Sequence, residues 1–140
     1  MTNYVEIEFP AVPENVEFAR VAMACFASQI NSFVLEEIDD IRLLTSEAVS
    51  NSIIHGYPGR PGIVRLRATI ADGTLEMIVE DEGRGIPDVK RAMQPAFTTR
   101  EDRLGMGFTI MEALADELEV YSEENKGTRV VIRKRPARSA

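Results

Sequence analysis

Apolar and polar residues alternate along several short stretches of the chain, and a period of two residues is typical of a half-buried β-strand. The stretches with this period are residues 3–9, 63–70, 74–81, 118–124 and 128–134. Asp72-Gly73 separates the second stretch from the third, and this dipeptide favours a two-residue hairpin turn. Asn125-Lys126-Gly127 joins the last two stretches. The pattern therefore predicts a separate first strand followed by two antiparallel hairpins.

Other stretches carry apolar residues at helical spacing. We expect long helices over residues 14–29, 36–55 and 108–119, and a short one over 88–93. The second helix opens with acidic residues, which the helix dipole favours at that end, and Gly56 should end it. Gly105 and Gly107 precede the third helix, so its N-terminus is a candidate anion site. An ordinary glycine-rich helix entry is the alternative.

Within the second predicted helix, Glu47, Asn51 and His55 follow one another at intervals of four residues, which stacks their side chains on one face. The carboxylate and the carboxamide could supply a proton acceptor and a neutral oxygen ligand for a metal beside one bound substrate. For an isolated Glu/Asn pair a solvated stripe is the commoner explanation, because charged residues are mostly exposed. His55 lies in the last turn, where a capping role is favoured over a ligand role.

Two polar segments connect the predicted elements near these residues. The loop DEGRGIP, residues 81–87, follows a strand, and its glycines permit a close approach of backbone to a flat ligand. The segment QPAFTTREDRLGMG, residues 94–107, has no clear period, and we interpret it as a lid. Both segments are candidates for the walls of a binding site.

Length and composition favour one folded unit. The chain has 140 residues, 44% of them hydrophobic, which suits one core, so we expect one domain over 1–135 and a frayed tail over 136–140. No leader and no run of about 18 apolar residues is present, so a cytoplasmic protein without a membrane span is expected. Cys25 is the only cysteine, which excludes an internal disulfide, and its apolar neighbours suggest a buried thiol.

The charge balance limits the classes of partner. A net charge of -7 argues against charge-driven binding to nucleic acid or to an anionic membrane, because such binding needs clustered cations. The basic cluster at the C-terminus, Arg133, Lys134, Arg135 and Arg138, is interpreted as a solvated end. The Walker phosphate loop, the dinucleotide fingerprint and the eukaryotic protein kinase motifs are all missing from the sequence. A nucleotide, if bound, is bound in some other way.

The motifs that are present occur in a specific order. They are E-x-x-x-N on a helix, D-x-G-x-G after a strand, a Thr-Thr-Arg lid, G-x-G at a helix start and Gly-Thr before the last strand. This order resembles the ATPase superfamily shared by histidine kinases, type II topoisomerases, mismatch-repair ATPases and the large heat-shock chaperone, and it covers nearly the whole chain. The resemblance implies an α+β fold, a two-layer α/β sandwich with helices on one face of a mixed, mainly antiparallel sheet.

Four sequence segments are more narrowly similar to the small anti-sigma serine kinases of endospore-forming bacteria. They are SEAVSNSIIHGY, VEDEGRGIP, AFTT and GMGFTIME. This resemblance implies ATP/ADP and Mg²⁺ as cofactors, Glu47 as general base, Asn51 as magnesium ligand and Asp81 as acceptor for the adenine amino group. Thr128 matches a threonine near that aspartate. The residues implied to border the nucleotide are Asn51, His55, Asp81, Gly83, Gly85, Ile86, Thr98, Thr99, Arg103, Gly105, Met106, Gly107, Phe108 and Thr128.

The same resemblance implies partners. They are a sporulation sigma factor, an anti-anti-sigma protein that supplies the substrate serine, and a second copy of the chain in a homodimer. Arg20 resembles a partner-contacting residue, although Val16 stands where an acidic residue is usual, and the lid over 97–105 is about two residues short. Three alternatives remain: a general-stress kinase of the same type, a non-catalytic nucleotide-gated binding module, and the ATPase part of a histidine kinase.

Overall fold

The computed structural model describes residues 2–93 and 102–137, with the side chains of 102–105 outside the description. The elements, in chain order, are β1 (Asn3–Pro10), α1 (Glu14–Ala27), α2 (Leu35–Asn51), η1 (Ser52–Gly56, a π-helical turn), β2 (Ile63–Ala71), β3 (Thr74–Asp81), α3 (Val89–Ala92), α4 (Asp102–Leu114), β4 (Glu117–Glu123) and β5 (Gly127–Lys134). Within the described part of the chain, no helix is long and apolar enough to cross a bilayer.

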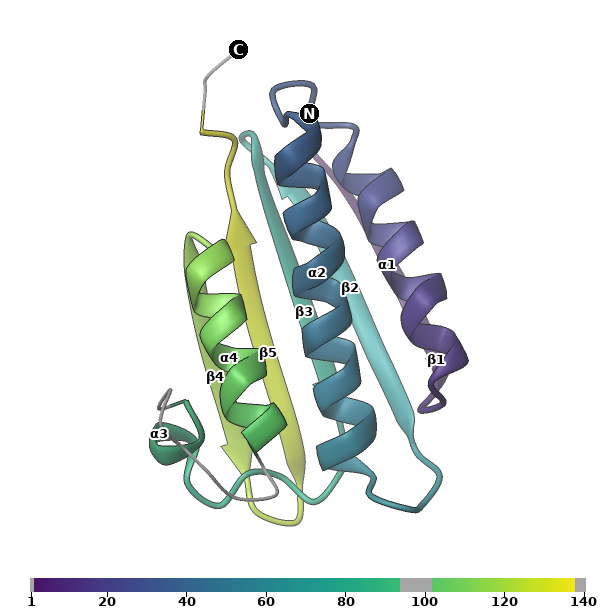
Figure 1. Ribbon diagram of the computed structural model, residues 1–140. Helices are drawn as coiled ribbons and strands as arrows, with labels where there is room; N and C mark the ends of the chain where they lie inside the picture. The colour runs from purple at the N-terminus through teal and green to yellow at the C-terminus, as the bar shows by residue number, and fades with distance from the viewer. Residues whose placement is uncertain (1, 94–101, 138–140) are drawn as a thin grey trace.

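The strands form one five-stranded sheet in the order β1-β2-β3-β5-β4, and its four pairings are all antiparallel. Helices α1, α2 and α4 lie side by side over one face of this sheet, with α2 in the centre (Figure 1). The predicted two-layer α+β class is confirmed. The crossover that places β5 between β3 and β4 brings the ends of α2, β3 and β5 to the same edge of the molecule.

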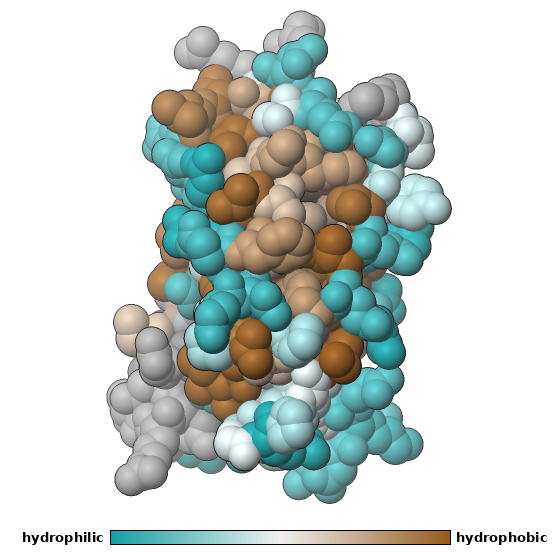
Figure 2. Space-filling model, turned by 90° about the vertical axis from the view of Figure 1, so that its right-hand side faces the viewer, coloured by the Kyte–Doolittle hydropathy of each residue, from teal (hydrophilic) through white to brown (hydrophobic). Residues whose placement is uncertain are grey.

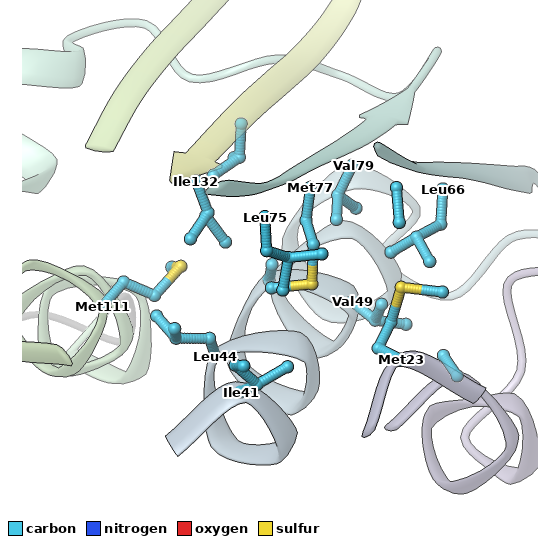
Figure 3. Close-up of a cluster of buried hydrophobic side chains, with 14 of the residues drawn as sticks. Met23, Ile41, Leu44, Val49, Leu66, Leu75, Met77, Val79, Met111 and Ile132 are labelled. Atoms are coloured by element: carbon cyan, nitrogen blue, oxygen red, sulfur yellow. The ribbon is translucent and has the colours of Figure 1, made fainter. Parts of the chain in front are cut away.

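The core lies between the two layers, because the inward positions of the strands are apolar and the helices turn their apolar faces toward them. Figure 3 shows these side chains from sheet and helices pointing toward one another. The largest fully buried ones are Phe108, Met23, Ile41, Leu44, Leu66, Ile70, Leu75, Met77, Met111, Ile132, Val49 and Val64. Each contributes about 1.5–3 kcal/mol through burial. This packing fixes α2 against the sheet and so fixes the polar residues on its last turns.

The outer face of the sheet is covered by cross-strand ion pairs. Arg65 Nε lies 2.8 Å from Glu8 Oε1 on β1, and Arg133 Nε lies 2.8 Å from Glu76 Oε2 on β3. Arg133 also reaches Glu117 and Glu119 on β4, at 3.2 and 3.6 Å. Exposed pairs of this kind contribute little individually, about 0–1 kcal/mol, and they keep this open face polar.

The prediction of a solvated basic C-terminus was wrong for Lys134, whereas Arg133 is partly exposed and Arg135 is exposed. Lys134 is buried on the inner face of β5, where its Nζ donates to the carbonyl of Leu114 at 2.7 Å and lies 3.8 Å from Asp40 Oδ2. Arg135 contacts Glu117 at 3.1 Å. These cations lie on or directly after β5, so the pleat directs them alternately to neighbouring acidic groups and to the end of α4. Arg138 lies outside the described residues.

Helix α4 differs from the prediction at both ends. It begins at Asp102, so Gly105 and Gly107 lie inside the helix and do not open it, and it ends at Leu114, before β4 starts at Glu117. A glycine inside a helix costs about 1 kcal/mol relative to alanine, and close packing of α4 on α2 offsets that cost at Gly107. The predicted anion site at a glycine-led helix start is therefore not at Gly105 or Gly107.

The prediction of a buried Cys25 thiol was also wrong. Cys25 is exposed on α1, on the same outward side as Phe18 and Val21, which are 55% and 54% exposed. Helix α1 has more apolar residues than one buried stripe can accommodate, and Ala19 and Met23 occupy the inward positions. Apolar neighbours in sequence therefore did not indicate burial.

Candidate functional site

Glu47 and Asn51 lie on the last turns of α2, facing α4. A methyl group placed on Gly107 would lie 3.0 Å from Glu47 Oε2 and 3.0 Å from Asn51 Nδ2, so the two side chains converge over the bare backbone of α4. The four-residue spacing accounts for this arrangement, because it places both side chains on one helix face. The structure thus brings together the carboxylate and the carboxamide that the sequence singled out.

The helix changes from α to π geometry at Ser52, directly after Asn51. A π-turn inserts a residue into the helical repeat, and such turns are rare and often found at functional sites. His55 therefore does not continue the α-helical face that carries Glu47 and Asn51. It nevertheless lines, together with Asn51, a small cavity that is described below. Its carbonyl accepts a hydrogen bond from Arg84 Nε at 2.9 Å, which ties the end of η1 to the glycine-containing loop.

Asp81 ends β3 at the floor of this cavity and is only 8% exposed. Its Oδ1 accepts a hydrogen bond from the amide of Gly83 at 2.9 Å. Burial raises the pKa of the Asp81 carboxyl above its usual range, and the hydrogen bond from Gly83 is the strongest influence in the opposite direction. The Ser52 hydroxyl and the Thr128 amide also lower this pKa. Asp81 is a buried acceptor aimed at the cavity and held by donors on three elements.

The loop after β3 is fastened on both sides. The amide of Arg84 donates to the carbonyl of Gly56 at 2.9 Å, and the amide of Asn125 donates to the carbonyl of Arg84 at 2.6 Å. Gly85 has a φ of 74°, and a Cβ there would lie 2.2 Å from the carbonyl oxygen of Glu123. Only glycine fits this position, because both the positive φ and the close backbone exclude a side chain.

One small cavity connects these groups, with a volume of about 20 Å³, which is room for about one water molecule. Its lining residues are Ala48, Asn51, Ser52, His55, Gly56, Asp81, Gly85, Ile86, Phe108, Thr128 and Val130. The set combines apolar walls with a few convergent polar groups, which is typical of a small-molecule site. Phe108 of α4 lines one side of the cavity.

The Asn51 side chain has a polar atom whose hydrogen-bonding capacity is not satisfied in the described structure. Its Nδ2 is buried and has no hydrogen-bond partner among the residues that the structure describes. A carboxamide offers a carbonyl acceptor as well as two N–H donors, and half a turn of the group exchanges their positions. Asn51 can therefore present either an oxygen to a hard cation or an N–H to an anion.

Several predicted site residues are placed differently or fall outside the description. Met106 lies on α4 with 61% exposure, and Phe108 is buried beside the cavity. Arg103 and Gly105 belong to α4, but the placement of the Arg103 side chain is not described. Thr98 and Thr99 lie outside the described residues. The prediction for Arg20 concerns partners; this residue lies on α1, 3.5 Å from Glu17.

The sequence analysis missed Tyr57 and Ser122. The Tyr57 hydroxyl donates to the carbonyl of Ile63 at 2.8 Å and accepts from the amide of Glu82 at 2.7 Å. Ser122 accepts a hydrogen bond from the amide of Ile86 at 2.7 Å. A signal existed for Ser122, because the strand period places it on the inward side of β4 as a polar residue. No local pattern distinguishes Tyr57.

Comparison with known proteins identifies the family of the chain. A model of the histidine kinase-like ATPase domain matches residues 9–134. The chain is 47% identical over 137 residues to an anti-sigma F factor of Clostridium acetobutylicum, covering 96% of this chain and 95% of that protein. It is 48% identical over 142 residues to an anti-sigma F factor of Geobacillus kaustophilus, covering 99% and 97%. The chain belongs to the anti-sigma F factor family.

Solved structures agree with the placement of this anti-sigma F family member among kinase-like ATPases. The histidine kinase domain of a blue-light-activated histidine kinase from Erythrobacter litoralis superposes with a TM-score of 0.58 and 27% identity. The match covers 85% of this chain and 61% of that one. A longer structure of the same kinase gives a TM-score of 0.60, and the chain spans 42% of it. A kinase-like ATPase domain is a nucleotide-binding domain, so the cavity between α2, β3 and α4 is the candidate nucleotide site.

Proposed function

We propose that the protein is an ATP-dependent protein serine kinase that also sequesters a sporulation sigma factor. The observation that carries the kinase part is the convergence of Glu47 and Asn51 over Gly107, beside a cavity with Asp81 at its floor. Membership of the anti-sigma F family supports the sigma-factor part. The substrate is proposed to be a serine of an anti-anti-sigma protein.

Glu47 is proposed as the general base. In the transfer, a bond forms between the substrate serine oxygen and the γ-phosphorus, the bond from that phosphorus to the β–γ bridging oxygen breaks, and ADP leaves. The serine proton passes to the Glu47 carboxylate, a contribution of about two to four orders of magnitude in rate. A binding module without catalysis has no need of a carboxylate beside the phosphates, so Glu47 favours the kinase over that alternative.

Asn51 is the proposed magnesium ligand through its carboxamide oxygen. When bound, Mg²⁺ neutralises charge on the phosphates, which a chain of net charge -7 otherwise repels. Asn51 Nδ2 is buried without a partner in the described structure, and a phosphate or metal-bound water would supply one. The Asn51 carboxamide can therefore contact the magnesium ion through its oxygen or a phosphate through its nitrogen.

Asp81 is proposed to select adenine. Its buried carboxylate is a pure acceptor when ionised, which suits the exocyclic amino group of adenine and opposes the carbonyl of guanine at the same position. Leaving such a group unpaired costs about 1–3 kcal/mol. ATP should therefore bind about 5- to 150-fold more tightly than GTP.

The proposed homodimer and the partner contacts are assigned to the side of the molecule that carries α1. Figure 2 looks onto this side and shows an apolar stripe down its middle with polar residues along both flanks. Phe18, Val21 and Cys25 are exposed residues of α1, and β1 is an edge strand of the sheet. An exposed stripe bordered by polar residues is typical of a protein interface. Arg20 lies on the same helix and is proposed to contact a partner.

The decisive experiment is phosphate transfer from γ-labelled ATP, with Mg²⁺, to a purified anti-anti-sigma protein of a sporulation operon. Phosphoserine is expected with the wild type and not with Glu47→Gln, while Glu36→Gln on the exposed first turn of α2 serves as matched control. A parallel pull-down with ATP and then ADP tests sigma-factor binding. Absence of phosphoserine from the wild-type reaction would overturn the kinase assignment.

A further inference from the structure

Three residues on neighbouring strands form one row across the sheet, and the row begins in the candidate nucleotide site. Asp81 of β3 pairs with Thr128 of β5, and Thr128 pairs with Ser122 of β4. Side chains opposite one another in an antiparallel sheet lie on the same face, so the row points toward the helices. Asp81 and Thr128 line the cavity, whereas Ser122 lies one strand behind it.

The Ser122 hydroxyl has three polar neighbours. It accepts from the amide of Ile86 at 2.7 Å and donates to the carbonyl of Gly127 at 3.1 Å. Its oxygen also lies 2.9 Å from Thr128 Oγ1. Ile86 belongs to the glycine-containing loop, so this single side chain joins the loop to the hairpin formed by β4 and β5.

Hydrogen counting favours one direction for the contact between the Ser122 and Thr128 hydroxyls. A serine hydroxyl has one hydrogen and two lone pairs. The hydrogen is directed to the Gly127 carbonyl, which can only accept, and one lone pair receives the Ile86 N–H. With the Ser122 hydrogen assigned to the Gly127 carbonyl, the second lone pair is left for Thr128, whose hydroxyl then donates to Ser122, one of the two directions that the 2.9 Å contact allows. With its hydrogen committed, Thr128 presents only lone pairs to the cavity.

We propose that Ser122 is a positioning residue for nucleotide selectivity: it holds the Thr128 hydroxyl as an acceptor beside the Asp81 carboxylate. Two acceptors side by side suit the two N–H hydrogens of an exocyclic amino group, and they disfavour a keto oxygen in its place because that oxygen meets no donor there. The inference rests on the proposed nucleotide site and extends it to a residue that lies outside the cavity. Ser122 acts through Thr128.

The test compares ATP with inosine triphosphate, which carries a keto oxygen in place of the amino group on the purine. Affinities for both are measured by calorimetry with Mg²⁺ for the wild type, Ser122→Ala and Ser122→Thr. Without the Ser122 hydroxyl, the Thr128 hydroxyl can rotate and donate its hydrogen to the keto oxygen of inosine triphosphate. We expect Ser122→Ala to reduce the preference for ATP by about 2- to 10-fold, the range of one neutral hydrogen bond. Ser122→Thr keeps the hydroxyl and should keep the preference.

Measurements in a Thr128→Val background separate a positioning role of Ser122 from a general effect of its substitution on protein stability. Thr128→Val removes the hydroxyl and should itself reduce the preference, and adding Ser122→Ala to it should change the ratio of the two affinities no further. Ser28→Ala, whose hydroxyl donates to the Cys25 carbonyl on α1, is the matched serine control and should leave the ratio unchanged. If Ser122→Ala does not fold, the Thr128→Val ratio decides.

An unchanged ratio in Ser122→Ala, or in Thr128→Val, overturns the proposal, and so does an equal loss of affinity for both nucleotides. These outcomes leave the kinase assignment standing, because wild-type ATP binding and phosphoserine formation are measured separately. A wild type that binds neither nucleotide overturns the positioning role and the nucleotide site together.

Discussion

The hydroxyl of Tyr57 accepts a hydrogen bond from the amide of Glu82 at 2.7 Å, across 25 residues of sequence. The same hydroxyl donates to the carbonyl of Ile63, and the ring packs so closely on Gly62 that a Cβ there would lie 2.3 Å from it. Tyr57 therefore joins the end of η1 to the start of β2 and to the residue after Asp81. Tyr57 thus holds the backbone directly after Asp81.

Tyr57→Phe should destabilise the protein by about 1–3 kcal/mol, because it leaves a part-buried amide and a carbonyl without their partner. Urea unfolding measures the change, and ATP affinity should fall with it as the Asp81 segment loosens. Tyr121→Phe is the matched control, since that hydroxyl is on an exposed side chain and contacts only Glu119 at 3.2 Å among the bonds described. Equal effects of the two substitutions would contradict the role given to Tyr57.

Glu47→Gln should lower the rate of phosphate transfer by about two to four orders of magnitude, since the amide cannot take the serine proton. ATP affinity, measured by calorimetry, should change by less than about 2-fold because the size of the side chain and one of its acceptor oxygens are retained. A parallel loss of both quantities would show that Glu47 has a structural role instead.

Asp81→Asn should change stability in a pH-dependent way. Burial raises the pKa of the Asp81 carboxyl above its ordinary value of 3.8, so the folded state binds its proton more tightly than the unfolded state. The wild type therefore loses stability as the pH rises from that value through the raised pKa, and the loss is complete above it. The asparagine variant has no such loss, so it should gain stability relative to the wild type as the pH rises from about 4 through the raised pKa.

The same substitution should weaken ATP binding by about 5- to 150-fold, because an amide cannot reproduce a pure acceptor without turning its N–H₂ away. Chemical denaturation across pH and calorimetry at neutral pH give the two readouts. A stability difference that is constant with pH would mean that the carboxyl is not perturbed, and unchanged affinity would place adenine elsewhere.

Gly107→Ala should separate folding from binding. Alanine is the better helix former by about 1 kcal/mol, but its methyl would lie 3.0 Å from both Glu47 Oε2 and Asn51 Nδ2. We expect a change in unfolding free energy within about 1 kcal/mol, together with a loss of nucleotide affinity of at least about 10-fold. Gly73→Ala, at a hairpin turn with a φ of 73°, should do the opposite, reducing stability and sparing affinity.

Lys134→Met should destabilise the fold by about 1–3 kcal/mol in thermal or urea unfolding. The variant keeps the apolar length of the side chain but removes the donor to the Leu114 carbonyl and the charge near Asp40. Lys126→Met, on an exposed side chain that pairs only with Glu123 in the described structure, should stay within about 0.5 kcal/mol. A neutral result at Lys134 would show that the end of α4 is held by packing alone.

The strands were predictable because alternation with a period of two is a local property, and β2 and β3 follow the expected bounds within one residue. The stack of Glu47 and Asn51 was equally local, since α-helical geometry alone places them together. Cys25 and Lys134 were misjudged because their exposure depends on which helix face meets the sheet and on what lies opposite β5. Their neighbours in sequence carried no information on either point.

The start of α4 shows a further limit. Two glycines favour a helix boundary when only local propensity is considered, yet the helix continues through Gly105 and Gly107. Tertiary packing decides here, because the absence of a side chain at Gly107 lets α4 approach Glu47 and Asn51. The roles of Tyr57 and Ser122 arise from contacts across 25 and 36 residues, which no window of sequence contains.

The cavity of about 20 Å³ has a kinetic consequence. Space of this size holds about one water molecule, so we expect the lining residues to move when a purine ring enters. The apparent affinity is then the intrinsic affinity multiplied by the fraction of molecules that are open. If opening precedes binding, the observed association rate should level off with rising ATP concentration at the rate of that opening, which belongs to the protein and not to the ligand.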